Sequence, residues 1–202
     1  ITLKEGEAAH GPQMLPGGDA LLFTLGSGTG GTGGWDKAQI VVQSLKSGVR
    51  KVLIEGGSDA RYSPTGHIVY VLGTTLLAVP FDIRKLEVAG GPVPIIEGVR
   101  RAANARGGAS AYFSYSSNGS MVYIPSGAAA GTQPLTVALV DRTGARKPLN
   151  IPAAPYTTPR VSPNGKQLAL GTDDGKESIV SMYDLSGTLP LTATGTYSIE
   201  VT

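Results

Sequence analysis

Ser63-Pro64-Thr65-Gly66-His67 is a glycine turn that leads directly into an apolar run, residues 68–72. Proline presets φ for a turn and glycine adopts positive φ, so this pattern predicts a tight turn before a strand. The pattern occurs four times, and the last glycine of each turn stands at 18, 66, 119 or 165, with intervals of 48, 53 and 46 residues. The chain is therefore built from repeats of one structural unit. The other turns are Leu15-Pro16-Gly17-Gly18-Asp19, Ser116-Ser117-Asn118-Gly119-Ser120 and Ser162-Pro163-Asn164-Gly165-Lys166.

Each repeat contains short runs of aliphatic and β-branched residues that end at Gly, Pro, Ser or Asp, which is typical of strands joined by hairpins. Four such strands per repeat and a period near 50 residues indicate one propeller blade per repeat. We therefore predict an all-β fold, a β-propeller or partial propeller of about four blades with four antiparallel strands each. The expected blade units of this single domain or fragment are residues 11–57, 58–106, 107–155 and 156–202.

Composition narrows the classes of function. The 202 residues include 29 Gly and 14 Pro, yet 41% are hydrophobic, so the chain is rich in turns but folded. A net charge of +2 with scattered charges argues against nucleic acid as a partner. No run of about 18 apolar residues is present, so we expect no membrane insertion. With no cysteine and two histidines, we expect no disulfide, metal site or other cofactor.

The repeat resembles the TolB-like, or WD-repeat-like, β-propeller family over roughly residues 3–187. More narrowly, Ala60-Arg61-Tyr62-Ser63-Pro64-Thr65-Gly66-His67-Ile68-Val69-Tyr70 with Leu76-Leu77-Ala78-Val79-Pro80-Phe81-Asp82 is similar to propeller segments that follow the kinase domain of bacterial serine/threonine kinases. That resemblance implies a sensory or interaction role and a periplasmic or other extracytoplasmic location, which the residues themselves leave unknown. The first turn departs from the family pattern because it has Leu15-Pro16-Gly17-Gly18 in place of Ser-Pro-Asp-Gly.

Two ways of completing the ring remain open. Residues 1–5 look like an outer strand and could close the fourth blade by pairing with residues 179–183, which would give a four-bladed ring. Alternatively, the chain is a fragment, and a homo-oligomer buries its open faces and completes a larger ring. The tail 188–202 has no counterpart in the other repeats, and the chain does not begin with methionine.

The sequence contains no convincing match to a known catalytic motif. Gly26-Ser27-Gly28-Thr29-Gly30-Gly31 matches a phosphate-binding loop in letters, but a strand follows it, so we interpret it as a loop between strands. No Gly-x-Ser-x-Gly, Ser-x-x-Lys or kinase motif is present, and we assign no catalytic residue. Asp173-Asp174-Gly175 lacks the later ligands of a calcium loop and is interpreted as a hairpin turn.

The candidate ligand-binding residues are one histidine and four arginines. His10 lies in the connection before the first inner strand, although a plain loop residue is the simpler interpretation, and we interpret His67 as a solvated turn residue. The arginines could bind an anionic ligand or acidic peptide if they border the tunnel. They are Arg61, Arg100, Arg101 and Arg160, with Arg106 in the same connection as the middle pair.

The sequence favours a non-catalytic module that binds a protein, peptide or small ligand at the propeller rim. Two alternatives stay open. One is an accessory propeller of a hydrolase such as a prolyl-oligopeptidase-like peptidase, and the other is a hydrolase that acts through the tunnel rim. Propeller frames carry unrelated functions in their loops, so the repeat by itself does not identify a ligand.

Overall fold

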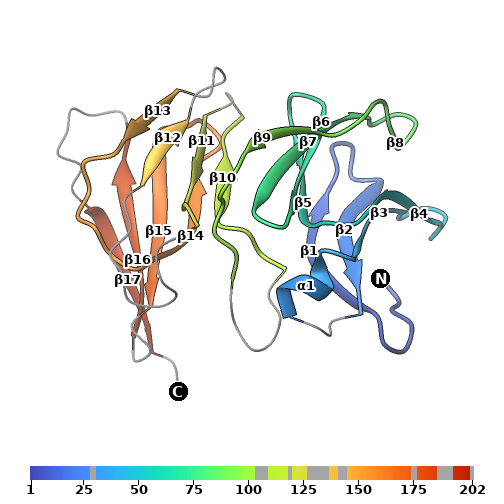
Figure 1. Ribbon diagram of the computed structural model, residues 1–202, viewed down its shortest axis with the longest axis horizontal. Coiled ribbons are helices and arrows are strands. Elements are labelled where there is room, and N and C mark those ends of the chain that lie inside the picture. The colour runs from blue at the N-terminus through green and yellow to red at the C-terminus, as the bar shows by residue number, and fades with distance from the viewer. Residues whose placement is uncertain are drawn as a thin grey trace. The chain divides into compact units, whose positions relative to one another are not determined.

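The computed structural model describes residues 1–27, 31–102, 109–117, 120–126, 137–140, 145–173, 177–185 and 193–200. The chain divides into two compact units, residues 1–111 and 112–202. Each unit holds two antiparallel sheets, so the predicted all-β class with about four antiparallel blades is confirmed, although one of the four sheets has a fifth strand. Figure 1 shows the strands in chain order within each unit.

The first sheet runs in the order β1-β2-β3-β4, as expected for consecutive hairpins. Its strands are β1 (Ala8–Met14), β2 (Ala20–Gly26), β3 (Gln39–Ser44) and β4 (Arg50–Glu55). A five-residue helix, α1 (Gly31–Trp35), lies between β2 and β3 and beside the ends of β1 and β2 (Figure 1). Because β3 is antiparallel to β2, this glycine-rich segment has no parallel strand–helix–strand crossover of the kind that dinucleotide-binding loops require.

The second sheet has a divided outer strand. It contains β5 (Ser58–Ser63), β6 (His67–Leu72) and β7 (Thr75–Asp82), and both β8 (Glu87–Val88) and β9 (Val93–Ile96) pair with β7. The two sheets of the first unit pack face to face through a core in which Leu22, Ile40 and Val42 meet Ile68 and Val79. Alternation along β2 and β3 explains why these residues share one face.

The second unit repeats this design. One sheet contains β10 (Phe113–Tyr115), β11 (Met121–Tyr123), β12 (Ala138–Val140) and β13 (Arg146–Pro148). The other contains β14 (Tyr156–Val161), β15 (Gln167–Asp173), β16 (Glu177–Asp184) and β17 (Ala193–Glu200). Their shared core includes Val122, Ile124, Leu168 and Leu170, all fully buried.

The fourth blade is closed by the C-terminal tail. β17 pairs with β16 from Glu177 to Tyr183, which is the place that the sequence analysis expected for residues 1–5. Residues 1–4 belong to no strand, so that expected pairing is wrong. An eight-residue strand that is adjacent in the chain pays a smaller loop-closure cost than a segment some 180 residues away.

The inner strands of three blades share a bulge. The register shifts between His10 and Gln13 in β1, between Ser58 and Arg61 in β5, and between Thr157 and Arg160 in β14. Each bulge holds one residue with positive φ, namely Gly11 (60°), Asp59 (50°) and Thr158 (43°). A bulge adds a residue to one strand and re-aims the side chains there. In β5 the residue with this backbone conformation is Asp59, whose side chain is a carboxylate.

Candidate functional site

Asp59 is the centre of a polar cluster in the first unit. Its side chain is 5% exposed, and its Oδ2 accepts hydrogen bonds from the Arg61 guanidinium and from the backbone N–H of Ala111, both at 2.8 Å. His10 Nε2 lies 3.7 Å from Asp59 Oδ1, an ion-pair distance when the imidazole is protonated. Ser110 Oγ stands 3.3 Å from the same imidazole nitrogen. We call these residues (His10, Asp59, Arg61, Ser110 and Ala111) the Asp59 cluster.

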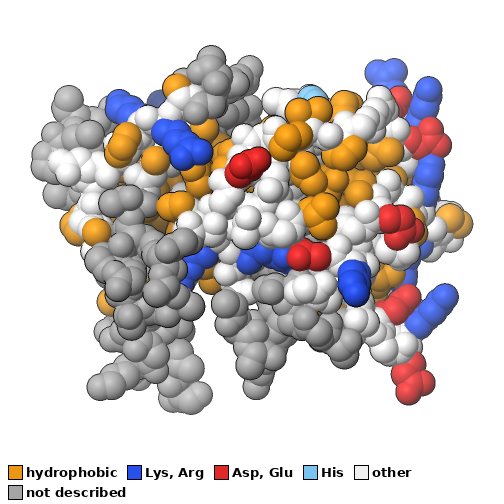
Figure 2. Space-filling view, in the orientation of Figure 1, with side chains coloured by type: hydrophobic (Ala, Val, Ile, Leu, Met, Phe, Trp, Pro, Cys, Tyr) orange, Lys and Arg blue, Asp and Glu red, His pale blue; other side chains and the backbone are white. Residues whose placement is uncertain are grey.

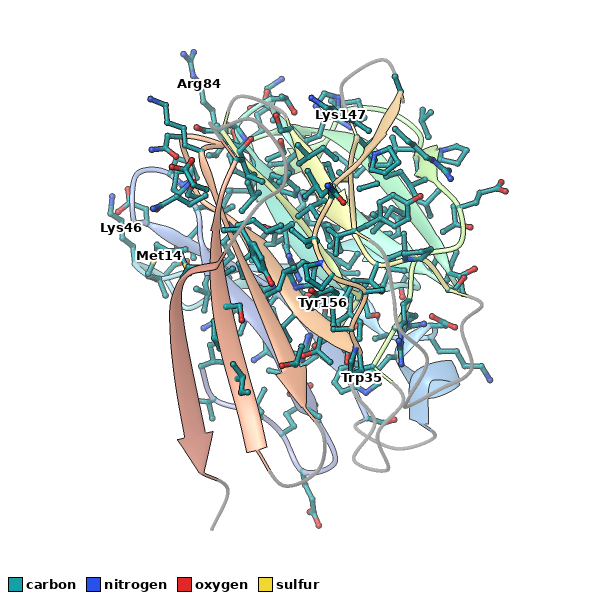
Figure 3. The ribbon with its side chains drawn as sticks, turned by 90° about the vertical axis from the view of Figure 1, so that its left-hand side faces the viewer. Met14, Trp35, Lys46, Arg84, Lys147 and Tyr156 are labelled. Atoms are coloured by element: carbon teal, nitrogen blue, oxygen red, sulfur yellow. The ribbon has the colours of Figure 1, made fainter. Side chains whose placement is uncertain are left out.

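The fold places the cluster by means of the two bulges. β1 contacts β5, so the bulge of β1 brings His10 toward that of β5. Gly11 lies directly against the cluster, since a Cβ there would be 3.5 Å from Asp59 Oδ1. The Trp35 ring lies 5.9 Å from the imidazole between centroids, and Figure 3 shows this side chain beside the α1 ribbon. His10 therefore lies in strand β1, beside Asp59, Ser110 and Trp35, and not in a loop as the sequence analysis expected.

Electrostatics hold Asp59 in its ionised form. Burial by itself raises the pKa of this carboxyl, but His10, the Arg61 charge and the Ala111 N–H lower it more. The pKa of Asp59 therefore lies below its usual value, because the partners stabilise the charged form. An ionised carboxylate whose two oxygens both have partners stabilises the packing of the segments around it. It does not act as a general acid near neutral pH.

A second group of polar side chains stands beside the cluster. The Arg101 guanidinium donates to Asp36 and, at 2.8 Å, to Ser58 Oγ, while Ser58 Oγ donates to the Ala109 carbonyl at 3.1 Å. The Arg101 side chain is 7% exposed and also approaches the Gly73 carbonyl at 3.3 Å. This bridge and the Asp59 cluster together fix residues 109–111 to β5.

The five predicted ligand-binding residues have different surroundings. His10 and Arg61 meet at Asp59, and Arg101 is paired with Asp36, so both of these guanidinium groups already have carboxylate partners. Arg100 is half-buried next to Arg101. Arg160 lies in β14 of the second unit, where it donates to the Pro159 carbonyl. Their role in binding a ligand stays a prediction.

Other predicted residues lie at ordinary turn positions. His67 begins β6 and its Nδ1 is 3.0 Å from the Thr65 carbonyl oxygen, within the turn itself. Arg106 and residues 174–175 lie outside the described residues. Within the described ranges, no group of three or more His, Asp or Glu side chains could hold a metal ion. No helix in those ranges is long and apolar enough to cross a membrane.

Sequence reasoning missed the acidic half of the site. Asp59 stands five residues before the proline of its turn, as Gly11 and Thr158 do before theirs. A glycine at the first of these positions signals positive φ, and Asp is among the residues that tolerate it. That signal could have identified Asp59, whereas no local pattern pairs Arg101 with Asp36, 65 residues away.

The meeting of Ser110, His10 and Asp59 does not form a catalytic triad. In a triad the carboxylate and the hydroxyl bind different nitrogens of the imidazole, so that one orients the ring while the other is deprotonated. Here Ser110 Oγ and Asp59 Oδ1 both face Nε2. The geometry cross-links three segments and lacks the relay that activates a nucleophile.

Figure 2 shows acidic and basic side chains interspersed on the side of the first unit that carries β4 and β8. Lys51 of β4 pairs with Glu87 of β8 at 2.6 Å on this side. Both side chains are about half exposed, so the pair is a surface contact of small energetic value.

No protein-family model matches the sequence, and no curated protein matches it either. Solved structures do resemble it. TolB from Acinetobacter baumannii is 19% identical with a TM-score of 0.59, and the match covers 92% of this chain and 43% of TolB. The Dos1 propeller is 10% identical with a TM-score of 0.53, covering 89% of this chain and 45% of Dos1.

The acylaminoacyl peptidase of Pyrococcus horikoshii is 11% identical with a TM-score of 0.54, and the match covers 96% of this chain and 32% of the peptidase. The chain thus spans less than half the length of these three proteins. None of the three is a kinase-linked propeller, so that narrower resemblance stays a prediction. At these identities the similarity shows the fold alone: the chain has the β-propeller fold and structurally resembles TolB.

Proposed function

We propose that the chain is a non-catalytic binding module, the sensory or interaction part of a larger bacterial protein. The observation that carries this proposal is that the Asp59 cluster cross-links segments of the fold. Its carboxylate, imidazole and guanidinium groups hold strands and a connection together, and the serine–histidine–aspartate geometry is not that of a triad. A rigid frame of this kind suits the presentation of rim loops to a protein, peptide or small ligand.

The catalytic alternative is tested by assay of the purified chain on ester, peptide and lactone substrates, with and without divalent metal. We expect no turnover above the buffer rate. Metal-independent turnover that disappears in the His10→Ala variant would overturn the proposal, because the His10 imidazole lies beside both a serine hydroxyl and the Asp59 carboxylate.

Ligand binding can be followed by the fluorescence of a tryptophan in the chain. Trp35 is the only tryptophan and lies 5.9 Å from His10, so its emission should respond to a ligand near the cluster. Titration with glutamate-rich peptides and small dicarboxylates tests the predicted anionic ligand. Arg100→Ala should weaken binding because Arg61 and Arg101 are already paired, while Arg84→Ala, which removes an exposed charge on another turn (Figure 3), should leave it unchanged.

A homo-oligomer that completes a ring belongs to the same proposal. Light scattering at micromolar concentration measures the mass directly, and a monomeric mass counts against that assembly. It leaves the binding role itself untouched, because a single propeller can present its loops without a second copy.

One observation favours a second candidate, an accessory propeller of a hydrolase. The chain matches acylaminoacyl peptidase over 96% of its own length and only 32% of that protein. This candidate requires a separate hydrolase domain in the full-length protein, with its own nucleophile. The full coding sequence decides between the two candidates, since a kinase domain supports the sensory role and a peptidase domain the accessory role.

A further inference from the structure

One imidazole nitrogen in the Asp59 cluster faces two oxygen atoms from different segments. His10 Nε2 lies 3.3 Å from Ser110 Oγ and 3.7 Å from Asp59 Oδ1. The second carboxylate oxygen, Oδ2, already accepts hydrogen bonds from Arg61 and from the Ala111 N–H. The Ser110 hydroxyl and Asp59 Oδ1 therefore share a single nitrogen of the imidazole.

The protonation state of the ring decides which of the two oxygens this nitrogen binds. As an acceptor, Nε2 binds the hydroxyl hydrogen of Ser110, and as a donor it binds Asp59 Oδ1. The neutral imidazole has one bare nitrogen and can take the first arrangement, whereas the protonated ring carries N–H on both nitrogens and can only donate. A charged N–H binds a carboxylate more strongly than a neutral hydroxyl. Protonation thus moves the hydrogen bond from Ser110 to Asp59.

The burial of the two side chains suits such a change. The His10 side chain is 27% exposed, so water can deliver a proton to it, while the Asp59 side chain is only 5% exposed. A carboxylate shielded from solvent attracts a new positive charge more strongly than an exposed one. Histidine is the side chain that changes charge between about pH 5 and 8. Asp59 stays ionised in that range, because its pKa lies below the ordinary 3.8.

The neighbours of the imidazole come from α1, β2, β5 and the connection 109–111. The charged ones in the described structure are Asp59 and Arg61 of β5, which form an ion pair with each other. The neutral ones are Trp35 of α1, Thr24 opposite His10 in the β2 ladder, and Ser110. Carboxylates and guanidinium groups do not titrate between about pH 5 and 8. A change of the cluster in this range therefore reports the imidazole.

Ser110 connects the imidazole to the segment that carries two of the predicted ligand-binding arginines. Its backbone carbonyl accepts the Ala102 N–H at 3.0 Å, and Arg101 forms a β-bridge with Ala111 on its other side. Arg100 immediately precedes this bridge. A change in the hydrogen bond of the Ser110 side chain therefore acts on residues 100–102.

We propose that His10 is a proton-sensing site, at which protonation moves the imidazole hydrogen bond from Ser110 to Asp59 and shifts residues 100–102 through the Ser110 backbone. The ligand of this site is the proton, and the output is the position of the arginine segment. This inference goes beyond the proposed function, because it holds with or without a ligand at the propeller rim.

NMR of the full ¹⁵N-labelled chain tests the proposal between about pH 8 and 5, where histidine titrates. The His10 ring nitrogens report protonation, and the Ala102 backbone amide reports the arginine segment. We expect the Ala102 resonance to shift with the same midpoint as the His10 ring. In Ser110→Ala the ring should still titrate, but the shift of Ala102 should be lost, because the hydroxyl that connects them is absent. His10→Gln should also lose the shift of Ala102.

His67→Gln is the matched control, because His67 is the other histidine of the chain. Its Nδ1 lies 3.0 Å from the Thr65 carbonyl oxygen within a turn, so its removal should leave the Ala102 curve unchanged. Trp35 emission gives a second readout, since a protonated imidazole quenches a nearby indole, and it should fall on acidification in the unchanged chain and in Ser110→Ala. If His10→Gln does not fold, Ser110→Ala carries the test.

Three results overturn the proposal. An Ala102 amide that does not shift while the His10 ring titrates shows a histidine whose charge acts on nothing beyond itself. A full Ala102 shift in Ser110→Ala shows that the serine hydroxyl is not the connection. Loss of the shift in His67→Gln assigns it to the other histidine. Each result leaves the binding proposal untouched, because no ligand is present in the experiment.

Discussion

The bulges of β1, β5 and β14 occur at one position of the repeat, five residues before the turn proline, but hold glycine, aspartate and threonine. All three residues have positive φ, between 43° and 60°. The backbone conformation is therefore a requirement of the blade, while the side chain is free to vary. Only at Asp59 does that side chain become buried and bind neighbouring segments.

The same backbone conformation costs these three residues different amounts of free energy. Glycine has no Cβ and adopts positive φ freely, aspartate tolerates it, and a β-branched residue such as threonine is strained there. Asp59 offsets its strain through Arg61 and Ala111, but Thr158 is exposed. The strain at Thr158 is thus the least compensated of the three.

Removal of the Asp59 charge should have the largest effect. Asp59→Asn keeps the tolerance of positive φ but leaves the half-buried Arg61 without its carboxylate, so we expect the free energy of unfolding to fall by about 2–3 kcal/mol. Urea unfolding followed by Trp35 emission measures this. Asp59→Ala, which also adds strain, should fall further. An Asn variant as stable as the unchanged chain would show that the cluster contributes no stability.

Acidification should reproduce that loss in the unchanged chain. The pKa of Asp59 in the folded protein lies below the ordinary value of 3.8, so the folded state binds fewer protons than the unfolded state as pH falls. Its contribution is complete above pH 3.8 and is lost as pH falls through the folded pKa. The stability gap between the unchanged chain and Asp59→Asn should therefore narrow progressively as pH falls below about 4. A gap of the same size at about pH 5 and at about pH 2 contradicts this assignment.

The repeat itself was predictable because its signals are local. The turn at residues 63–67 and the apolar run after it correspond to β6, and the run 50–55 is β4. The bulges were not predicted, because alternation in one strand does not show where its neighbour shifts register. β17 was missed because its residues, Ala193–Glu200, are only weakly apolar and gain their place by pairing with β16.

The candidate site was predictable only in its basic half. His10, Arg61 and Arg101 were identified by residue type, but their acidic partners depend on contacts between distant segments. Ala111 donates to Asp59 across 52 positions, and Arg101 to Asp36 across 65. Such pairing depends on how the blades pack, and the local spacing of residues does not show it. The sequence analysis therefore treats the arginines as cations available to a ligand, whereas Arg61 and Arg101 are paired with carboxylates in the structure.

Gly11→Ala tests the backbone requirement with little change in contacts. The new Cβ would lie 3.5 Å from Asp59 Oδ1, an ordinary contact distance, so the cost comes from φ at 60°. We expect destabilisation of about 1–2 kcal/mol in urea unfolding. Gly91→Ala is the matched control, because Gly91 has no positive φ and its Cβ would meet open space. Equal effects of the two changes would indicate that φ at Gly11 is not constrained.

Thr158→Asn should have the smallest effect and the opposite sign. Asparagine adopts positive φ more readily than a β-branched residue, and the Thr158 side chain is exposed, so we expect stabilisation by about 0.5–1 kcal/mol. Thr157→Asn is the control, since Thr157 is a ladder residue opposite Gly171 with ordinary φ, where asparagine is a poor strand former. The two variants should therefore shift the urea midpoint in opposite directions. If both lower it, the packing of Thr158 against Gly171 outweighs its strain, and the bulge of β14 is held by contacts as that of β5 is.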